Sequence, residues 1–437
     1  TETPFFLTDI KNVTMKQIYL FGVALMGSLA LQACSQSDGQ TADSNTGRDQ
    51  VIALAVANGN GIATRAGRPL LSSEANHTIE NVVVYVVKAS DNTVVATKTF
   101  SDWQNESADY RTDDGRYAEF LLDDRLDDGD YRIFAVGYHN DSAYGDIPGT
   151  LVPAGTFQEN AVLSLAADAG AEELFAGSTG SFSVTRDQGF KKEIVLNRQV
   201  AGVYVYVREI PYMEQGTRLR LVSSAENNRL VLGHFSTLDL TDNGTGSGVA
   251  EAVVNGTSAD PAFDKVLATI DLAEWFVSIE DADGDNLIDT GADYANWRKP
   301  ARYNGVATFE KGSVFAGEFV IPFARVDATQ SLKLQLTTAG GVVKREWNVN
   351  LPDTEAYTLY TWNGSGFGSG ESVTEDGNSY NIVRNHLYGL GSRATNDPGH
   401  GTDPDPGPGG DEPVSLDNKH AVSYTHLRAH ETRGNLV

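Results

Sequence analysis

The sequence predicts an all-β protein built from two antiparallel β-sandwich domains in tandem. Short segments rich in β-branched and aromatic residues recur along the chain, and the clearest are residues 51–57, 81–88, 131–138, 202–208, 318–322 and 332–336. Turn-forming residues such as Asp-Asp-Gly bound these segments, and helical signals are scarce between them. Strands at this spacing without intervening helices favour sandwiches over one large barrel.

Length and composition set the scale of this fold. The 437 residues suffice for two or three domains, and the 40% hydrophobic content suffices for their cores. Lys333 and Gln335 alternate with three leucines, which indicates a half-buried antiparallel strand. The net charge of −26 repels polyanions, so we expect no nucleic-acid partner.

The N-terminal region predicts an export and lipidation signal. Residues 15–33 combine Met15-Lys16 with an apolar run too short for a membrane span, and they predict a signal peptide. Leu-Gln-Ala-Cys at 31–34 is similar to a bacterial lipobox, and Cys34 is the chain's single cysteine. We therefore expect acylation of Cys34 (diacylglycerol and palmitate), which would anchor the chain to outer-membrane lipid. Residues 1–14 are interpreted as upstream translation, and residues 34–48 as a tether.

The remaining chain divides by composition. We predict an N-terminal sandwich at 49–190 and a C-terminal sandwich at 191–393. The Pro-, Gly- and Asp-rich residues 394–420 predict a linker, after which another strand should follow. Residues 421–437 resemble the translation of a sequencing adapter, and we interpret them as replacing the native C-terminus.

One acidic segment suggests metal chemistry. Asp281, Asp283, Asp285 and Asp289 alternate with other residues in a turn-rich stretch, and such carboxylates can converge on Ca²⁺. The glycine of this stretch is its fourth residue rather than its sixth, and Ala292 stands where a calcium loop has glutamate. A plain acidic loop is therefore the main expectation, with no cofactor, and a Ca²⁺ site is the alternative.

Catalytic signatures are missing from the sequence. The serines among the glycines at 364–370 lack the spacing of a nucleophile elbow and predict a hairpin loop. Metalloprotease, phosphate-loop and dinucleotide motifs are absent, so we expect a protein that is not an enzyme. A glycan-binding or adhesin surface lipoprotein is an alternative, with Trp103, Trp275, Trp297 and Trp362 as stacking platforms. For most of these tryptophans, burial in a core is the main expectation.

The order of several short motifs resembles the fimbrillin family, the lipoprotein subunits of the type V pilus. After the lipobox come Ala-Thr-Arg at 63–65, the strand at 81–88 and Glu-Leu-Phe-Ala-Gly at 173–177. Leu-Asn-Arg-Gln-Val-Ala at 196–201 and Val-Arg-Asn-His-Leu-Tyr at 383–388 complete the series. The resemblance implies transthyretin-like sandwiches, other pilus subunits as partners, a surface-exposed outer-membrane and fimbrial location, and a role in adhesion or biofilm formation. Stalk, tip and anchor variants all fit it.

The resemblance also implies a maturation step. A trypsin-like protease cuts many members after an arginine, and the first strand is then replaced by one from a neighbouring subunit. In this chain Ile52, Leu54 and Val56 alternate with small residues, so their segment can cover one face of a sandwich and serve as the removable or donor strand. Arg65 lies in an accessible Gly-, Ala- and Thr-rich stretch, whereas Arg68 precedes a proline that disfavours cleavage. Arg65 is therefore the expected cleavage site, with an ordinary loop arginine as the alternative.

Overall fold

The computed structural model describes the chain from residue 49 to residue 427 with gaps. The described ranges are 49–57, 79–109, 115–139, 142–166, 169–232, 252–257, 260–303, 309–325, 331–350, 357–374, 381–384, 387–391, 413–417, 421–423 and 425–427. Strands dominate these ranges, and the helices are single turns. The predicted all-β fold is therefore confirmed, while its division into two tandem domains stays a prediction.

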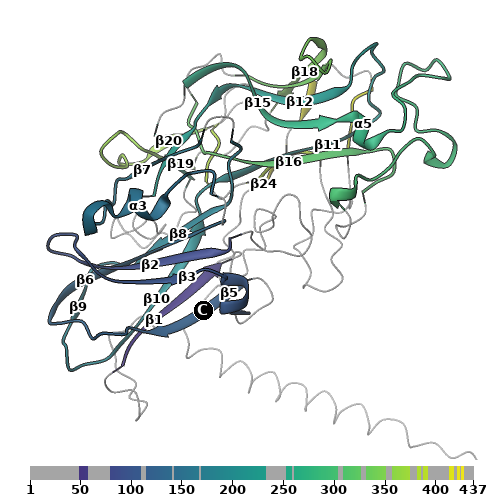
Figure 1. Cartoon of the computed structure of the whole chain (residues 1–437). Coiled ribbons are helices and arrows are strands. Elements are labelled where there is room, and N and C mark those ends of the chain that lie inside the picture. The colour runs from purple at the N-terminus through teal and green to yellow at the C-terminus, as the bar shows by residue number, and fades with distance from the viewer. Residues whose placement is uncertain are drawn as a thin grey trace, which may run out of the picture. The chain divides into compact units, whose positions relative to one another are not determined.

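The largest sheet of the described residues belongs to the N-terminal half. Its strands run in the order β3-β2-β6-β8-β10-β1-β5-β4, with β9 paired to β6 (Figure 1). The bounds are β1 Gln50–Ala57, β2 Asn81–Lys88, β3 Val94–Phe100, β4 Ala108–Asp109, β5 Gly115–Leu121, β6 Gly129–Tyr138, β8 Leu174–Ser178, β9 Phe182–Val184 and β10 Phe190–Arg198.

Strand β2 shows why this half has apolar runs rather than simple alternation. Val82, Val84 and Val86 belong to one hydrophobic core, whereas Val83 and Tyr85 belong to a second core on the opposite face. A strand covered on both faces has no solvent side, so every position favours an apolar residue. The continuous run at 81–88 therefore reflects burial on two sides.

The other strands form four smaller sheets within the described residues. Their orders are β16-β11-β21-β24 with β22 paired to β11, β15-β12-β17-β18-β23, β13-β7, and β14-β19-β20. The bounds are β7 Val162–Ser164, β11 Ala201–Arg208, β12 Arg218–Glu226, β13 Arg229–Val231, β14 Ala252–Val254, β15 Asp260–Asp271, β16 Val314–Val320, β17 Leu332–Thr337, β18 Val343–Asn350, β19 Tyr357–Thr361, β20 Glu371–Val373, β21 Leu387–Leu390, β22 Val414–Ser415, β23 Ala421–Ser423 and β24 Thr425–Leu427.

In the part of the chain that the structure describes, helical structure is confined to short connections. The elements are α2 Trp103–Glu106, α3 Ile147–Leu151, α5 Leu272–Trp275 and the 3₁₀ turns η3 Pro153–Gly155, η4 Ala292–Tyr294 and η5 Ala301–Tyr303. None of the helices in the described ranges has the length and hydrophobicity needed to cross a membrane.

Strand direction departs from the purely antiparallel expectation. Most pairs among the described strands are antiparallel, but the pairs β1–β10, β11–β21, β11–β22, β14–β19 and β18–β23 are parallel. These partners are far apart in sequence, and a long connection permits either direction where a hairpin permits only the antiparallel one. Alternation within one strand carries no information about its direction relative to a distant partner.

The strand pairing can be compared with the predicted boundaries of the domains and of the linker. The expected boundary at 190/191 falls at the start of β10, yet β10 pairs with β1 and β8 of the N-terminal half. Val414–Ser415 form β22 inside the stretch 394–420 that the sequence predicts to be a linker, so a strand begins before the predicted end of that linker. Further on, β23 and β24 pair with β18 and β21. The proposed origin of residues 421–437 stays an interpretation of the sequence.

Candidate functional site

The predicted site residues fall into two groups. Cys34 and Arg65 lie outside the described residues. Ile52, Leu54 and Val56 lie on β1, and the four aspartates lie in a loop between α5 and η4. The structure does not bring β1 and the acidic loop into one site, so each is described by itself.

Strand β1 is an interior strand of its sheet. It pairs in parallel with β10 over seven residues, from Gln50 opposite Phe190 to Val56 opposite Leu196. On its other side it pairs antiparallel with β5, from Val51 opposite Leu121 to Ala57 opposite Gly115. Figure 1 shows β1, drawn in purple, beside β10 and β5. Removing β1 would therefore expose one hydrogen-bonding edge on each of these two neighbours.

One face of β1 forms part of the hydrophobic core. The side chains of Ile52, Leu54 and Val56 are fully buried, as the alternation in the sequence predicts. In this core they join Ile194 and Leu196 of β10. Burying three aliphatic side chains of this size stabilises a fold by roughly 5 to 9 kcal/mol. An empty β1 position would thus expose an apolar trough as well as two unpaired edges.

On the opposite face of β1, Val51 is half-buried and the two alanines that follow it are closed to solvent. Ala53 is 0% exposed and Ala55 is 1% exposed. Above them, Lys191 of β10 forms an ion pair with Glu119 of β5, and the Tyr117 hydroxyl donates a hydrogen bond to the same carboxylate. Since β10 and β5 flank β1, their backbones lie about 10 Å apart, and this ion pair must cross over β1. We call the Lys191–Glu119 pair the strap.

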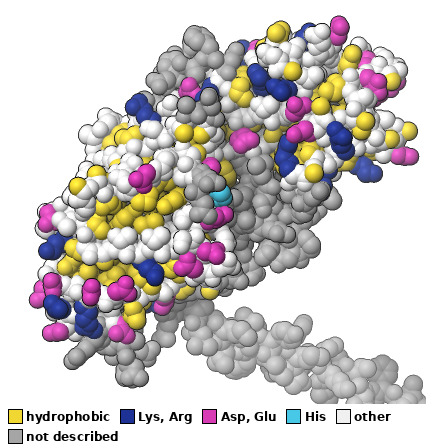
Figure 2. Space-filling view, in the orientation of Figure 1, with side chains coloured by type: hydrophobic (Ala, Val, Ile, Leu, Met, Phe, Trp, Pro, Cys, Tyr) yellow, Lys and Arg dark blue, Asp and Glu magenta, His cyan; other side chains and the backbone are white. Residues whose placement is uncertain are grey.

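The strap acts through its position more than through its energy. The Lys191 and Glu119 side chains are 57% and 39% exposed, and exposed ion pairs contribute at most about 1 kcal/mol. The hydrogen bonds from Lys191 and Tyr117 hold the pKa of Glu119 below its ordinary value, so the carboxylate is charged at neutral pH. On the face shown in Figure 2, cationic and anionic side chains are interspersed in the same manner. What distinguishes the strap is the small residue that lies beneath it.

Gln50 anchors the beginning of β1 to a neighbouring loop. Its side chain is buried, and its Oε1 accepts a hydrogen bond of 2.8 Å from the backbone N–H of Leu126. Its backbone carbonyl accepts a second bond, of 3.2 Å, from the N–H of Leu122. Leu122 and Leu126 line a cavity of about 360 Å³ between β3 and the connection that follows β5. The first residue of β1 thus fixes one wall of this cavity.

Sequence reasoning missed Gln50, Lys191 and Glu119 as parts of this site. The alternation with alanines was visible, but the reason for the alanines was not. In the pairing register Ala53 stands opposite Glu119 and Ala55 opposite Tyr117, and that arrangement depends on the pairing of three strands distant in sequence.

The motifs that carried the family resemblance converge in a buried polar network. Arg198 donates two hydrogen bonds to Oε1 of Glu173, at 2.8 and 2.6 Å, and both side chains are almost fully buried. The neighbouring Gln199 accepts a 3.0 Å bond from Arg384, and its carbonyl accepts a 3.1 Å bond from Asn255. The segments at 173–177, 196–201 and 383–388 therefore meet in space. Their shared chemistry is structural, because a buried charge requires a fixed partner.

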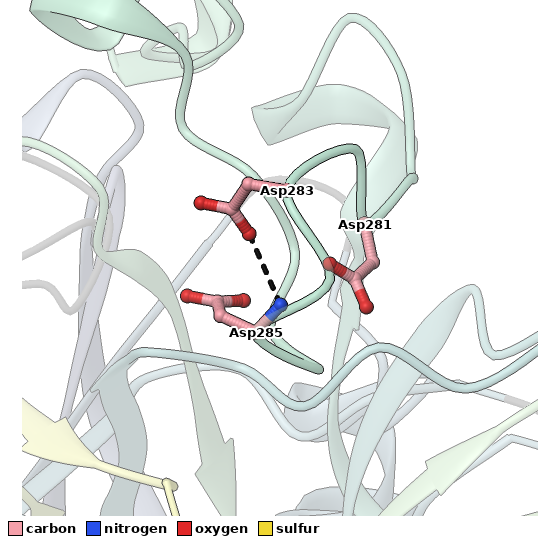
Figure 3. A group of neighbouring side chains, drawn as sticks. All are labelled: Asp281, Asp283 and Asp285. Carbon is pink, nitrogen blue, oxygen red and sulfur yellow. Dashed lines mark hydrogen bonds between the residues drawn. The ribbon is translucent and has the colours of Figure 1, made fainter.

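The acidic loop gathers three of the four predicted carboxylates. Asp281, Asp283 and Asp285 each offer one oxygen within 4.8 Å of the others, and all three come from one tight turn (Figure 3). Asp283 Oδ1 accepts a 3.1 Å bond from the N–H of Asp285. Asp289 is not part of this group, and its carboxylate accepts a hydrogen bond from the N–H of Ala282. Three largely exposed aspartates can attract a cation, but they leave most of the six to eight oxygens that Ca²⁺ takes to solvent.

The tryptophans expected to serve as stacking platforms are largely internal. Trp103 and Trp275 are fully buried, and Trp362 is 9% exposed. Trp297 is half-buried, stands 6.4 Å from Trp275 between ring centroids, and donates its indole N–H to the carbonyl of Ser313. A buried indole cannot present its face to a sugar, whereas the half-buried Trp297 keeps part of its surface exposed. The glycan-binding alternative therefore loses three of the four tryptophans on which it was based.

Comparisons with known proteins give matches of low similarity. No family model and no curated protein matches the sequence. Among solved structures, the fimbrial anchor protein Mfa2 from Porphyromonas gingivalis is 13% identical with a TM-score of 0.33, covering 77% of this chain and 99% of that one. A fimbrial assembly protein from Parabacteroides distasonis is 12% identical with a TM-score of 0.35, covering 77% and 98%.

A third solved structure completes this set. The tip fimbrial protein Mfa3 from Porphyromonas gingivalis, truncated at its C-terminus, is 12% identical with a TM-score of 0.36, covering 78% of this chain and 93% of that one. Identities and TM-scores as low as these carry no weight in assigning a function.

Proposed function

We propose that this chain is a structural, non-enzymatic fimbrial subunit, exported as a lipoprotein and assembled by exchange of β-strands. The observation that supports the proposal is β1. It is an interior strand, buried on both faces, and it is the first strand of the described chain. Its loss would leave two unpaired edges and an apolar trough, which a strand from another subunit would repair.

The order of features along the chain fits a maturation step. Cys34 precedes β1, and Arg65 lies between β1 and β2 in sequence. Cleavage after Arg65 would separate the acylated N-terminus and β1 from the remainder of the chain. From that point β1 would be held only by non-covalent contacts. The partners of this proposal are outer-membrane lipid through Cys34, a trypsin-like protease, and other fimbrial subunits, and its location is the cell surface.

Limited proteolysis tests this proposal. Protein beginning after Cys34 is treated with limiting trypsin and followed by mass spectrometry and size exclusion, with Arg65→Gln as the matched control. We expect one early cut, after Arg65, in a product that stays folded and then binds a synthetic β1 peptide. Resistance at Arg65 with β1 retained would rule out a polymerising subunit and favour an anchor or tip role.

A further inference from the structure

We propose that the position occupied by β1 selects its occupant by side-chain size on the outer face and by a hydrogen-bond acceptor at the strand's beginning. The partner it fits is an extended segment with branched aliphatic residues at alternate positions and small residues between them. In this segment, a residue whose side chain bears a carbonyl oxygen stands two positions before the first core-facing aliphatic residue. In β1 these two residues are Gln50 and Ile52. This inference rests on the proposed strand exchange and names the strand that can take part in it.

The size limit comes from the strap. In the pairing register Lys191 stands beside Val51 on β10, and Glu119 stands beside Ala53 on β5. Their ion pair crosses the outer face of β1 between these two positions. Ala53 has no exposed surface beneath it. A leucine at that position would have to displace the strap and the side chains beside it, and overpacking of this kind is unfavourable.

The strap and the core together fix a single register. A shift by one residue would turn Ala53 and Ala55 toward the core and Ile52 and Leu54 toward the strap. Both faces would then be mismatched, because the core would lose its aliphatic groups and the outer face would gain them. The same rule excludes strands of this chain that are apolar on both faces. β2 carries Val83 and Tyr85 between its core valines, so it cannot pass beneath the strap.

The polar requirement comes from Gln50. Its Oε1 accepts a hydrogen bond from the Leu126 N–H in a buried setting. An occupant with an apolar side chain at this position would bury that N–H without a partner, which weakens binding. The backbone carbonyl of any occupant could still accept the hydrogen bond from the Leu122 N–H. Only the side chain at this position therefore distinguishes one occupant from another.

A peptide-exchange assay tests both requirements. The full chain is cleaved between β1 and β2, at Arg65 or at a protease site inserted beside it. Fluorescent peptides of residues 49–57 then compete for the β1 position, and their affinities are measured by anisotropy. Relative to the native peptide, we expect about 30-fold weaker binding for Ala53→Leu and about 10-fold for Gln50→Met. The matched core control, Ile52→Val, should lose only about 3-fold.

A variant of the chain separates the strap from a general packing effect. In Glu119→Ala the strap is gone, so the penalty of the Ala53→Leu peptide should fall below about 5-fold while that of Gln50→Met stays near 10-fold. An unchanged Ala53→Leu penalty in this variant would overturn the role of the strap. Equal binding of all four peptides to the unmodified chain would overturn the selection but leave strand exchange standing. If the native peptide fails to bind the cleaved chain, the strand exchange and the selection both fall.

Discussion

The buried ion pair between Glu173 and Arg198 allows a quantitative prediction. Their side chains are 0% and 3% exposed, and the Arg198 guanidinium also lies 4.8 Å from the centroid of the Phe175 ring. In Glu173→Gln the hydrogen-bond acceptor remains, but the guanidinium loses its negative partner. Breaking a buried pair by removing one charge costs about 3 to 5 kcal/mol, and the retained amide acceptor favours the lower end of that range. We expect a loss of about 3 kcal/mol in the free energy of unfolding.

Urea denaturation measures this change. The midpoint shift multiplied by the urea slope gives the difference in unfolding free energy, with tryptophan fluorescence as the probe. Glu159→Gln is the matched control, because the Arg132–Glu159 pair is 21% and 30% exposed. Such a pair contributes at most about 1 kcal/mol. If Glu173→Gln shifts the midpoint no more than this control does, the assigned role of the buried network is wrong.

Three further predictions concern other parts of the molecule. The pKa of Glu119 is lowered in the folded chain. Charged Glu119 therefore stabilises the fold above the ordinary carboxyl pKa of about 4.3, and this stabilisation is lost as the pH falls through the lowered pKa. After cleavage, β1 should therefore dissociate faster below about pH 4 but at constant rate from pH 6 to 8, and Glu119→Gln should abolish the step in a stopped-flow exchange profile. Lys98 stands on the core face of the edge strand β3, opposite Val84, and such inward charges keep edges from pairing. Lys98→Val should self-associate in analytical ultracentrifugation at concentrations where the parent chain is monomeric, and a monomeric variant would contradict this reading. For the acidic loop, calorimetric titration should detect no Ca²⁺ binding with a Kd below about 1 mM, because three carboxylates converge there. A micromolar Kd that is lost in Asp283→Asn would instead show that the loop is a calcium site.

Local patterns predicted several of the strands, although the predicted segment 318–322 starts four residues later than β16 and runs two residues past its end. The run at 81–88 matches β2 residue for residue, and the alternation of Ile52, Leu54 and Val56 correctly indicated the face of β1 that meets the core. The glycine-rich stretch at 364–370 lies between β19 and β20, as a hairpin loop should. These features depend on neighbours in sequence, and the side-chain period of a strand reports them directly.

Features that depend on pairing between distant segments could not be predicted. The parallel direction of β1 relative to β10 follows from a connection of more than a hundred residues, and no local pattern encodes it. The strap requires that Lys191 and Glu119 stand on either side of β1, which only the register of three strands reveals. The sequence favoured burial for most of the tryptophans, but the loop position suggested for Trp103 was wrong, because polar neighbours in sequence do not exclude burial by remote strands. Trp103, preceded by Ser-Asp, is fully buried.

A reversible lock on β1 tests the central claim most directly. Leu54 of β1 stands opposite Ala118 of β5, and the two can be replaced by cysteines in a chain that also carries Cys34→Ser. After cleavage beside Arg65, the oxidised double variant should fail to bind the fluorescent β1 peptide, and reduction should restore binding to the level of the cleaved parent chain. Binding that is equally fast in the oxidised and reduced states would show that the incoming peptide does not take the place of β1, and would contradict strand exchange at this position.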